Sequence, residues 1–527
     1  MSKELLFGEE ARERLKKGVD KIANAVKSTL GPGGRNVILQ RGSLPHITKD
    51  GVTVAKDIFL EDPVENIGAE VIKKAAIKTG EIAGDGTTTS TVLAQALFSD
   101  GISGIEHFNS VEVKNGMDKT VKEVVSMLAA LSTPIDGDMN KIRQVALVSS
   151  NNDKEIADLI TNAMSQIKRE GILTVEESKT EFTRIEVVEG TKIDRGYVSP
   201  YFVTNQEKME CVLINPYIIM HDKTIETVKE MIPLITQINE EKGCALFICE
   251  DMQGEALSAL CLNKMEKVFK SAAIRTPGFG DIAEDYLEDI AIITGGSVIS
   301  EKAGYSLEKV GIEILGRADK VIITKDSTII IGGKGDKEDI GSRVNQIKAQ
   351  IEQAENPATK DILKNRLAAI DGGVAVLYIG AQTEIEMKER KDRVDDALHA
   401  TRAAVEEGFV AGGGIALLRV YKEIIQKTIG STESELHGSS IVKRALTKPF
   451  EQIITNATGE YSNDMLQVVL KDEDKNFGFN SRTGKFGDMV EAGVIDPTKV
   501  VRVAIENAVS VAGTLLTTEC ISYNKVR

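Results

Sequence analysis

A glycine-flanked acid followed by three threonines is the segment of this 527-residue sequence best suited to hold a phosphate group. Residues 84–89 read GDGTTT, and an apolar run at residues 92–97 predicts a helix that follows them. Glycines let the backbone approach a ligand closely, and a helix N-terminus with three hydroxyls can bind phosphate oxygens. Asp85 at this turn is suited to binding Mg²⁺. The lysine of the usual P-loop is missing, and a threonine-rich helix start without a ligand explains the segment equally well.

Three further turns have the composition of a nucleotide pocket. Residues 30–34 read LGPGG, residues 48–51 read TKDG, and residues 411–414 read AGGG. The glycines expose the backbone, and Lys49 beside Asp50 offers a cation next to an acid. Each turn taken alone is better explained as an ordinary helix stop or surface turn. Together they resemble the scattered walls of one nucleotide site.

Asp396 is the candidate for activating a water molecule. It belongs to residues 393–398, RVDDAL, where we predict the start of a helix that leads to Gly408 and the glycine triplet. A carboxylate in this position can orient an attacking water molecule. A solvated acid on a helix surface is the alternative interpretation.

The composition argues against several classes of function. The chain has 80 acidic and 65 basic residues and no run of Lys and Arg interleaved with aromatic residues, so we expect no nucleic-acid partner. Its five cysteines form no CxxC pair and do not cluster with the five histidines, which removes the usual support for a metal or disulfide framework. No stretch approaches the roughly 18 apolar residues of a membrane span. We expect a cytoplasmic protein with no membrane partner, because the first residues lack a signal-peptide core.

The elements that would position these residues are mainly helical at both ends of the chain. From residue 8 to about 130, the first apolar helix face is marked at helical spacing by Leu15, Val19, Ile22 and Val26. After residue 385 the pattern returns to long helices. The last of them is predicted to begin with Asp496 as its N-cap and a proline in its first turn.

The middle of the chain, from about residue 190 to 373, alternates short β-rich runs with amphipathic helices. This pattern is typical of an α/β domain. Residues 245–249 read as a strand, and residues 321–323 and 328–331 are close enough to form a hairpin. Helical segments therefore flank an α/β middle, which indicates that the middle is an insertion and that the two ends form one domain. The length supports about two to four domains.

Eight stretches of sequence together carry a family resemblance. In chain order they are TLGPGGRNV, TKDGVTVAK, AGDGTTTSTVLAQAL, DRGYVSPYF, EDMQGEAL, PGFGD, DALHATRAAVEEG and VAGGG. They occur in the order found in the group I chaperonins of the GroEL type, and the resemblance runs almost from end to end. It implies an ATPase that couples ATP hydrolysis to protein folding.

The resemblance implies a multidomain α and α/β fold with three domains. A helical equatorial ATPase domain is expected at residues 1–132 and 409–527, and a small α/β intermediate domain at residues 133–189 and 374–408. The α/β apical domain, which binds substrate proteins, is expected at residues 190–373. The positions that resemble the family's hinges are Pro134, Gly408, Gly190 and Gly373.

The resemblance also implies which residues line the nucleotide. Asp85 resembles the Mg²⁺ ligand, and Asp396 resembles the carboxylate that positions the hydrolytic water, with Asp50 as its helper. The residues expected around a K⁺ ion are Thr29, Lys49 and Thr88. The full set expected at the ATP site is Leu30, Gly31, Pro32, Lys49, Asp50, Gly51, Asp85, Gly86, Thr87, Thr88, Thr89, Ser149, Gly413, Asn480 and Asp496.

In the apical domain, the resemblance implies an exposed apolar rim that binds non-native proteins and the loop of a co-chaperonin. Such a rim binds unfolded chains by burying their apolar surface without sequence preference. Burial in a core is the commoner fate of such side chains. The residues expected at the rim are Tyr197, Tyr201, Phe202, Ile232, Ile235, Leu257, Cys261 and Leu262.

The expected partners are further copies of the chain, unfolded client proteins and a GroES-type co-chaperonin. The resemblance implies two stacked seven-membered rings, with a single ring or another subunit number as alternatives. Two departures from the family stand out: Gly33 occupies a position where Lys is usual, and the sequence shows no Gly-Met-rich tail, so the cavity floor is expected to differ. A bacterial, organellar or viral source stays open. A small-molecule kinase with the same phosphate loops and a scaffold without turnover are the rival interpretations.

Overall fold

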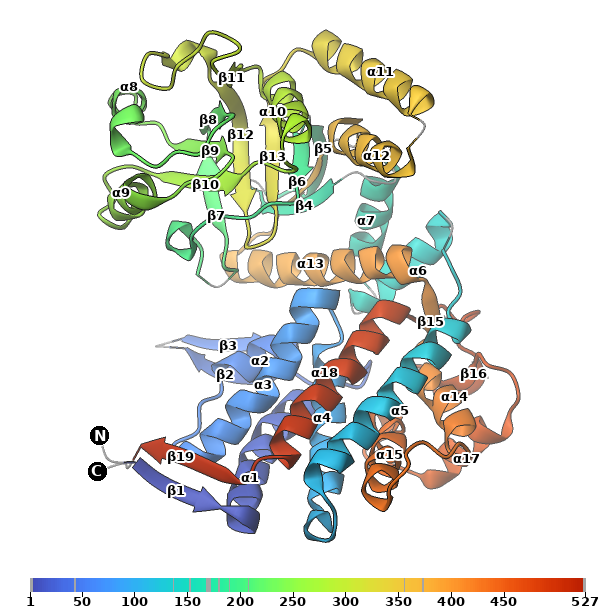
Figure 1. Ribbon diagram of the computed structural model, residues 1–527. Helices are drawn as coiled ribbons and strands as arrows, with labels where there is room; N and C mark the ends of the chain where they lie inside the picture. The colour runs from blue at the N-terminus through green and yellow to red at the C-terminus, as the bar shows by residue number, and fades with distance from the viewer. Residues whose placement is uncertain are drawn as a thin grey trace. The chain divides into compact units, whose positions relative to one another are not determined.

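The computed structural model describes residues 3–41, 44–135, 137–150, 153–166, 172–178, 181–188, 190–206, 208–354, 356–371 and 374–524. The chain forms two compact units (Figure 1). The first unit consists of residues 1–161 and 383–527, and the second consists of residues 162–382. The helical ends and the α/β middle expected from the sequence patterns are confirmed.

Long helices build the first unit. They are α1 (Gly8–Lys27), α2 (Gly51–Asp57), α3 (Pro63–Ala83), α4 (Thr87–Ile102), α5 (Ser110–Leu131), α6 (Met139–Ser149), α13 (Glu384–Glu407), α14 (Ile415–Ile424), α15 (Glu433–Ala445), α16 (Lys448–Thr458), α17 (Asn463–Lys471) and α18 (Thr498–Leu516). Helix α7 (Lys154–Gln166) begins in this unit and ends in the second. The predicted apolar face of α1 is confirmed, because its four residues are buried in the core between α1, α3, α4, α5, α15 and α18. Figure 1 shows α18 running between α3 and α5.

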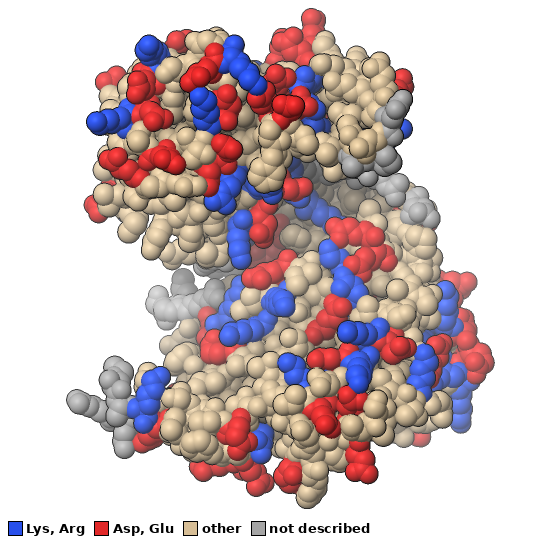
Figure 2. All heavy atoms as spheres, in the orientation of Figure 1, with Lys and Arg blue, Asp and Glu red and all other residues tan. Residues whose placement is uncertain are grey.

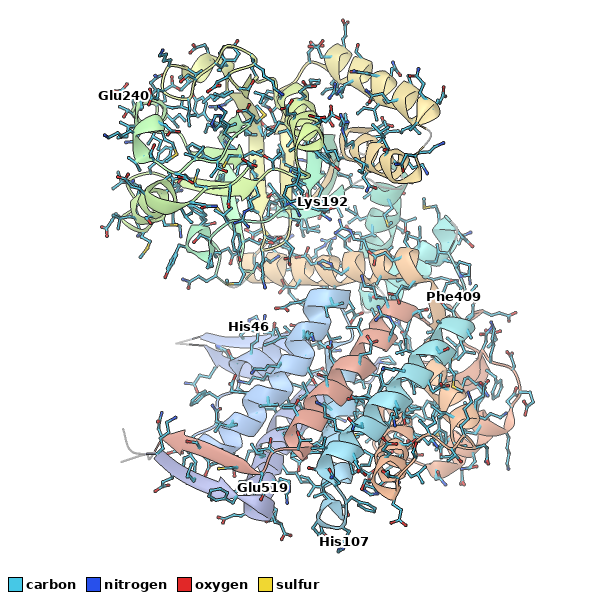
Figure 3. The ribbon with its side chains drawn as sticks, in the orientation of Figure 1. His46, His107, Lys192, Glu240, Phe409 and Glu519 are labelled. Atoms are coloured by element: carbon cyan, nitrogen blue, oxygen red, sulfur yellow. The ribbon has the colours of Figure 1, made fainter. Side chains whose placement is uncertain are left out.

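Short antiparallel strand pairs complete the first unit. The two ends of the chain pair with each other through β1 (Lys3–Phe7) and β19 (Cys520–Asn524). The other pairs are β2 (Val37–Arg41) with β3 (Leu44–Thr48), β15 (Phe409–Ala411) with β18 (Ile495–Pro497), and β16 (Phe477–Asn480) with β17 (Lys485–Asp488). Figure 3 labels Phe409, at the start of β15. The pair β15–β18 matters most for the site, because it joins segments far apart in sequence.

A mixed sheet forms the core of the second unit. Its main path runs β10 (Ser271–Arg275), β9 (Ala245–Cys249), β8 (Tyr217–His221), β12 (Gly316–Ile323), β13 (Thr328–Gly333) and β6 (Gly190–Ile193). Strand β11 (Val298–Ile299) pairs with β8, and β7 (Cys211–Ile214) pairs with β12. Strands β8, β9 and β10 are parallel, whereas β12 and β13 form the predicted antiparallel hairpin.

Helices and a smaller sheet surround this core. The helices are α8 (Ile232–Glu240), α9 (Gly254–Met265), α10 (Asp281–Thr294), α11 (Lys337–Gln353) and α12 (Pro357–Asp371). The smaller sheet has the order β4 (Ile172–Glu177), β14 (Val374–Ile379) and β5 (Arg184–Val188). The second unit is therefore α/β in character, as the alternating sequence pattern predicted. The separate intermediate domain stays a prediction, and its hinge residue Gly373 lies outside the described residues.

Charged side chains of both signs are intermixed over the face of the molecule that Figure 2 shows. The exposed Arg275 illustrates the pattern at the residue level: its guanidinium forms an ion pair with Asp251 at 2.7 Å between the Nε and Oδ1 atoms. Isolated pairs of this kind at the surface contribute little to stability, typically about 0–1 kcal/mol. The apolar cores of the two units therefore carry most of the folding free energy.

Two predicted helix starts are wrong. Asp496 does not cap α18, because it belongs to β18 and Pro497 occupies the N-cap position. Helix α13 begins at Glu384, so Asp396 lies in its middle and not at its start. The strand pairing of Asp496 with Val410 explains the first difference, since a residue held in a β-ladder keeps its carboxylate for another partner.

Candidate functional site

The turn between α3 and α4 presents a free helix N-terminus. Gly84 ends α3 in the left-handed conformation, with φ of 73°, and Gly86 is the N-cap of α4, with φ of 82°. A Cβ atom on Gly86 would lie 2.6 Å from Val500 Cγ1, so only glycine fits there. The predicted threonine run forms the first turn of α4, where backbone N–H groups have no partner within the helix. This end of α4 therefore combines N–H donors, hydroxyls and the positive end of a helix dipole.

The predicted Asp50–Gly51 turn lies directly beside this helix start. Asp50 caps α2 by accepting hydrogen bonds from the N–H groups of Val52 at 3.2 Å and Thr53 at 2.7 Å. Gly51 packs against Thr88, because a Cβ atom on Gly51 would overlap the Thr88 Oγ1 atom. The same position lies next to Val26, at the end of α1. Two of the four segments expected at the site are therefore in contact.

The glycine triplet reaches the site through the β15–β18 pair. Val410 is the ladder partner of Asp496, and the Gly413 N–H donates a hydrogen bond to the Asp496 carboxylate. A Cβ atom on Gly412 would lie 3.0 Å from Asp496 Oδ1. The negative charge of Asp85 acts on Asp496, so these two carboxylates are neighbours. Asp85 and Asp496, which are 411 positions apart in the sequence, thus meet at one place.

Helix α13 brings Asp396 to the same carboxylates. One turn after Asp396, His399 packs against Gly84 so closely that a Cβ atom on Gly84 would overlap the His399 side chain. The far end of α13 is tied to α18 by ion pairs of Arg502 with Glu407, at 2.6 Å between Nη2 and Oε1, and of Lys499 with Glu406, at 2.5 Å. Asp396 lies within electrostatic range of Asp50 and Asp85. The structure therefore gathers the four predicted acids.

The carboxyl groups of this cluster are partly buried and repel one another. Burial, followed by the charges of Asp50 and Asp85, raises the pKa of Asp396 well above its ordinary value. Burial also raises the pKa of Asp85, while the Gly86 N–H and the Ser149 hydroxyl, which both donate to its carboxylate, act in the opposite direction. Burial and the charge of Asp85 raise the pKa of Asp496 to about 7. Closely spaced carboxylates of this kind are stabilised by a cation.

The donor set fits a Mg²⁺ ion that is bound together with phosphates. Within the described parts of the chain, no three His, Cys, Asp or Glu side chains are arranged to hold a metal ion by themselves. Mg²⁺ at nucleotide sites usually takes one or two carboxylates and completes its shell with phosphate oxygens and water. Asp85, already ordered by the Gly86 N–H at 2.5 Å, is the carboxylate suited to this role.

The loop after α1 lies next to helix α16. A Cβ atom on Gly31, whose φ is 76°, would lie 3.2 Å from Ile453 of α16. Thr29 is buried, and its hydroxyl donates to the Val26 carbonyl at 2.8 Å. Lys49 has an exposed side chain. No contact joins Thr29 to Lys49 or Thr88 among the interactions described, so the K⁺ site stays a prediction.

Asn480 lies at the end of β16. Its Oδ1 accepts the N–H groups of Arg482 at 3.1 Å and Thr483 at 3.3 Å, which shapes the turn into β17. The strand is connected to the triplet through Met489, which packs against both Gly478 and Gly413. No described interaction joins Asn480 to the four acids, so its contact with the nucleotide stays a prediction.

The eight predicted rim residues divide into an exposed and a buried group. Tyr201, Ile232 and Leu262 are 61%, 50% and 59% exposed, and Tyr197, Ile235 and Leu257 are partly exposed. The prediction of an exposed rim position is wrong for Phe202 and Cys261, which are 0% and 8% exposed in the core of the second unit. These two residues point inward from η2 (Pro200–Phe202) and α9 to fill that core.

The structure adds residues that the sequence patterns did not single out. Met265 and Val268, at and just after the end of α9, are both 58% exposed and lie close in sequence to the exposed Leu262. The apolar spacing along α9 could have indicated Met265, which follows Leu262 by three positions.

His399 and Asn456 contact the loops of the candidate site, and no local sequence pattern marks them, because their partners are distant in the chain.

Residues 22–525 match the sequence model of the TCP-1/cpn60 chaperonin family. Two crystal forms of the chaperonin gp146 from bacteriophage EL 2 (Pseudomonas aeruginosa), both in the presence of ATP-BeFx, are similar in fold. Crystal form II is 23% identical with a TM-score of 0.70, and crystal form I is 22% identical with a TM-score of 0.63. Each comparison covers 99% of both chains.

In the part of the chain that the structure describes, every helix is too short or too polar to cross a bilayer.

Proposed function

The chain belongs to the TCP-1/cpn60 chaperonin family, as its motifs predicted, and on this premise we propose that it is an ATP-driven chaperonin of group I. In this proposal it captures non-native proteins on an apolar rim and encloses them in a ring cavity for folding. ATP binding and hydrolysis drive the cycle. The single observation that carries the proposal is the meeting of Asp50, Asp85, Asp396 and Asp496 beside the free N-terminus of α4.

The phosphates of ATP would be bound by the first turn of α4. Its N–H groups and the hydroxyls of Thr87, Thr88 and Thr89 are donors, and the helix dipole favours an anion at this end. Asp85 would hold a Mg²⁺ ion, whose positive charge offsets that of the phosphates. The glycine turns at residues 31–34 and 412–414 would let the backbone approach the nucleotide closely.

Asp396 would orient the water that attacks the terminal phosphate. The new bond forms between the water oxygen and the γ-phosphorus, the bond from that phosphorus to the ADP oxygen breaks, and a proton of the water passes to the carboxylate. A carboxylate with a raised pKa is a stronger base than an ordinary aspartate. Asp50, which contributes to that rise, would assist as the neighbouring negative charge.

Tyr201, Ile232 and Leu262 would form the rim that receives unfolded proteins, with Met265 and Val268 added. Exposed apolar side chains bind unfolded segments because both partners lose water-accessible apolar area. We propose that ATP binding draws the intermediate domain onto the nucleotide, rotates the apical domain and hides this rim, which releases the client into the cavity. A cavity requires several copies of the chain, which we propose form two stacked seven-membered rings that a GroES-type lid can close.

Phosphate release from ATP by the purified full-length protein tests the proposal. We expect steady hydrolysis in Mg²⁺ buffer without any added metabolite, and a change in rate when a chemically denatured protein is supplied. A small-molecule kinase would need a specific acceptor, and a scaffold would release no phosphate. Either of these outcomes would overturn the proposed function.

A further inference from the structure

Helix α16 packs against two of the glycine turns at once. On one side, a Cβ atom on Gly414 would lie 2.9 Å from the backbone nitrogen of Phe450 in α16. On the other side, Ile453 packs against Gly31, and a Cβ atom on Gly33 would lie 2.5 Å from Ala457 Cα and 2.6 Å from the Asn456 carbonyl oxygen. One rigid helix therefore fixes the separation between the turn at 412–414 and the loop at 30–34.

The loop itself is closed by its own backbone. The Gly34 N–H donates to the Gly31 carbonyl at 3.0 Å, and the Arg35 N–H donates to the Ser28 carbonyl at 2.9 Å. These bonds fix the shape of the loop, but they do not fix its position against the rest of the unit. That position depends on what the loop contacts outside itself.

Asn456 supplies the outside hydrogen bonds. Its Nδ2 donates to the Lys27 carbonyl at 2.8 Å and to the Leu30 carbonyl at 2.9 Å. The Lys27 carbonyl, at the C-terminal end of α1, also accepts the Leu30 N–H at 3.2 Å, so the Asn456 amide is a second donor to it. Gln452 orients this amide, since its Nε2 donates to Asn456 Oδ1 at 2.8 Å. The chain Gln452–Asn456–Leu30 thus connects α16 to the loop.

We propose that Asn456 is a positioning residue for the nucleotide, acting by holding the Leu30 carbonyl and so fixing the peptide plane between Leu30 and Gly31. This inference rests on the proposed function, in which residues 30–32 line ATP. The direction of the Gly31 N–H and the approach of Pro32 both follow from that peptide plane. Asn456 itself does not touch the nucleotide.

If Asn456 only positions the nucleotide, its loss should affect nucleotide binding and hydrolysis differently. Asp85 and Asp396 lie on the α3–α4 turn and on α13, and neither is hydrogen bonded to α16 among the described interactions. Loss of the Asn456 amide should weaken nucleotide binding and leave the hydrolytic step of bound ATP largely unchanged. A general loss of structure would lower both.

The experiment compares full-length wild-type protein with Asn456→Ala. ADP binding is measured by titration calorimetry in Mg²⁺ buffer, and KM and kcat are measured by phosphate release from ATP. We expect ADP affinity to fall and KM for ATP to rise by roughly tenfold, as the loss of two hydrogen bonds suggests. We expect kcat to stay within about twofold of wild type.

Asn109→Ala is the matched control, because Asn109 also makes two backbone hydrogen bonds through its side chain, at the start of α5 and away from the loop. It should leave ADP affinity and KM unchanged. Gln452→Ala, which removes only the residue that orients the amide, should give a smaller rise in KM, and it serves as the test if Asn456→Ala does not fold.

The proposed function and the role of Asn456 are contradicted by different results. A wild-type protein that binds no ADP and hydrolyses no ATP would overturn the proposed function. A wild type that does both, with folded Asn456→Ala and Gln452→Ala equal to it, would overturn the role of Asn456 alone. An equal loss of kcat and affinity in Asn456→Ala, or the same loss in Asn109→Ala, would also overturn that role.

Discussion

Gly51 packs against the hydroxyl oxygen of Thr88 so closely that a Cβ atom at position 51 would overlap it. The two residues belong to segments that are 37 positions apart, and Asp50 next to Gly51 caps α2. The contact places the start of α2 against the first turn of α4. The hydroxyl of Thr88 can keep its place only while position 51 has no side chain.

Gly51→Ala should displace the Thr88 hydroxyl and weaken ADP binding. The loss of a hydrogen bond to a charged phosphate corresponds to a decrease in affinity of roughly 10- to 100-fold. Titration calorimetry with ADP and Mg²⁺ measures this. In a double-mutant cycle, Gly51→Ala should add little to the effect of Thr88→Ala, because the hydroxyl is already gone. Fully additive losses would show that position 51 acts independently of Thr88.

The raised pKa of Asp496 predicts that the nucleotide-free protein loses stability as pH rises. Burial and the charge of Asp85 raise this pKa from 3.8 to about 7. Between these values the unfolded chain releases the proton while the folded chain keeps it, so the free energy of unfolding decreases with pH and then levels off. Asp496→Asn can still accept the Gly413 hydrogen bond and lacks this penalty. Between pH 5 and pH 8, wild type should lose up to about 3 kcal/mol relative to the variant.

Urea unfolding in EDTA at the two pH values measures this difference. Asp326→Asn, which changes an exposed carboxylate in the β12–β13 turn, is the control and should follow wild type. Parallel pH profiles for wild type and Asp496→Asn would contradict the assignment of a buried, repelled carboxyl to position 496.

Gly33→Ala should destabilise the first unit. The added methyl group would meet backbone atoms of Ala457 and Asn456, which cannot move without shifting α16. Overpacking of this kind costs about 1–3 kcal/mol. Gly487→Ala is the matched control in the same unit, because a Cβ atom there has open space and the backbone needs no left-handed conformation. Equal urea midpoints for the two variants would argue against close packing at Gly33. The contacts of Gly33 with the backbone of Ala457 and Asn456 also explain why a lysine side chain does not fit at this position.

Much of the fold followed from local patterns. The apolar spacing in α1, the helix that follows the GDGTTT segment, and the hairpin of β12 with β13 are all set by neighbours in sequence, and all are confirmed. The start of α13 was predicted at residues 393–398 and not at Glu384, because residues 384–393 are mostly charged and carry no regular apolar stripe. Its N-cap, Thr383, accepts from the Glu386 N–H at 3.2 Å, a signal too common to be decisive alone.

The candidate site was predictable as a set of segments, but its geometry was not. Asp496 was expected to cap a helix because Asp-Pro is a frequent helix start, yet a three-residue strand holds it opposite Val410. That pairing spans 86 positions, and no local pattern reports it. The burial of Phe202 and Cys261 likewise depends on how η2 and α9 pack on the sheet, which their sequence neighbours do not determine.

Tyr201→Glu should weaken the capture of a denatured protein and leave ATP hydrolysis without client unchanged. The side chain is 61% exposed, so the substitution leaves the core intact and replaces apolar surface with a charge. Loss of one apolar anchor in every copy of a ring should reduce capture by at least about tenfold. Val468→Glu, at an exposed position of α17, is the control. Pull-down of a labelled denatured protein measures capture, and wild-type capture by Tyr201→Glu would show that the rim lies elsewhere.

The most direct test of the central claim is ATP binding and phosphate release measured together on Asp396→Asn, with Glu389→Gln on the same helix as control. The substitution keeps the shape of the side chain and removes the group that takes the proton from water. We predict ATP affinity within about threefold of wild type and hydrolysis slower by at least about 100-fold. Turnover at the wild-type rate in a variant that binds ATP would contradict the account.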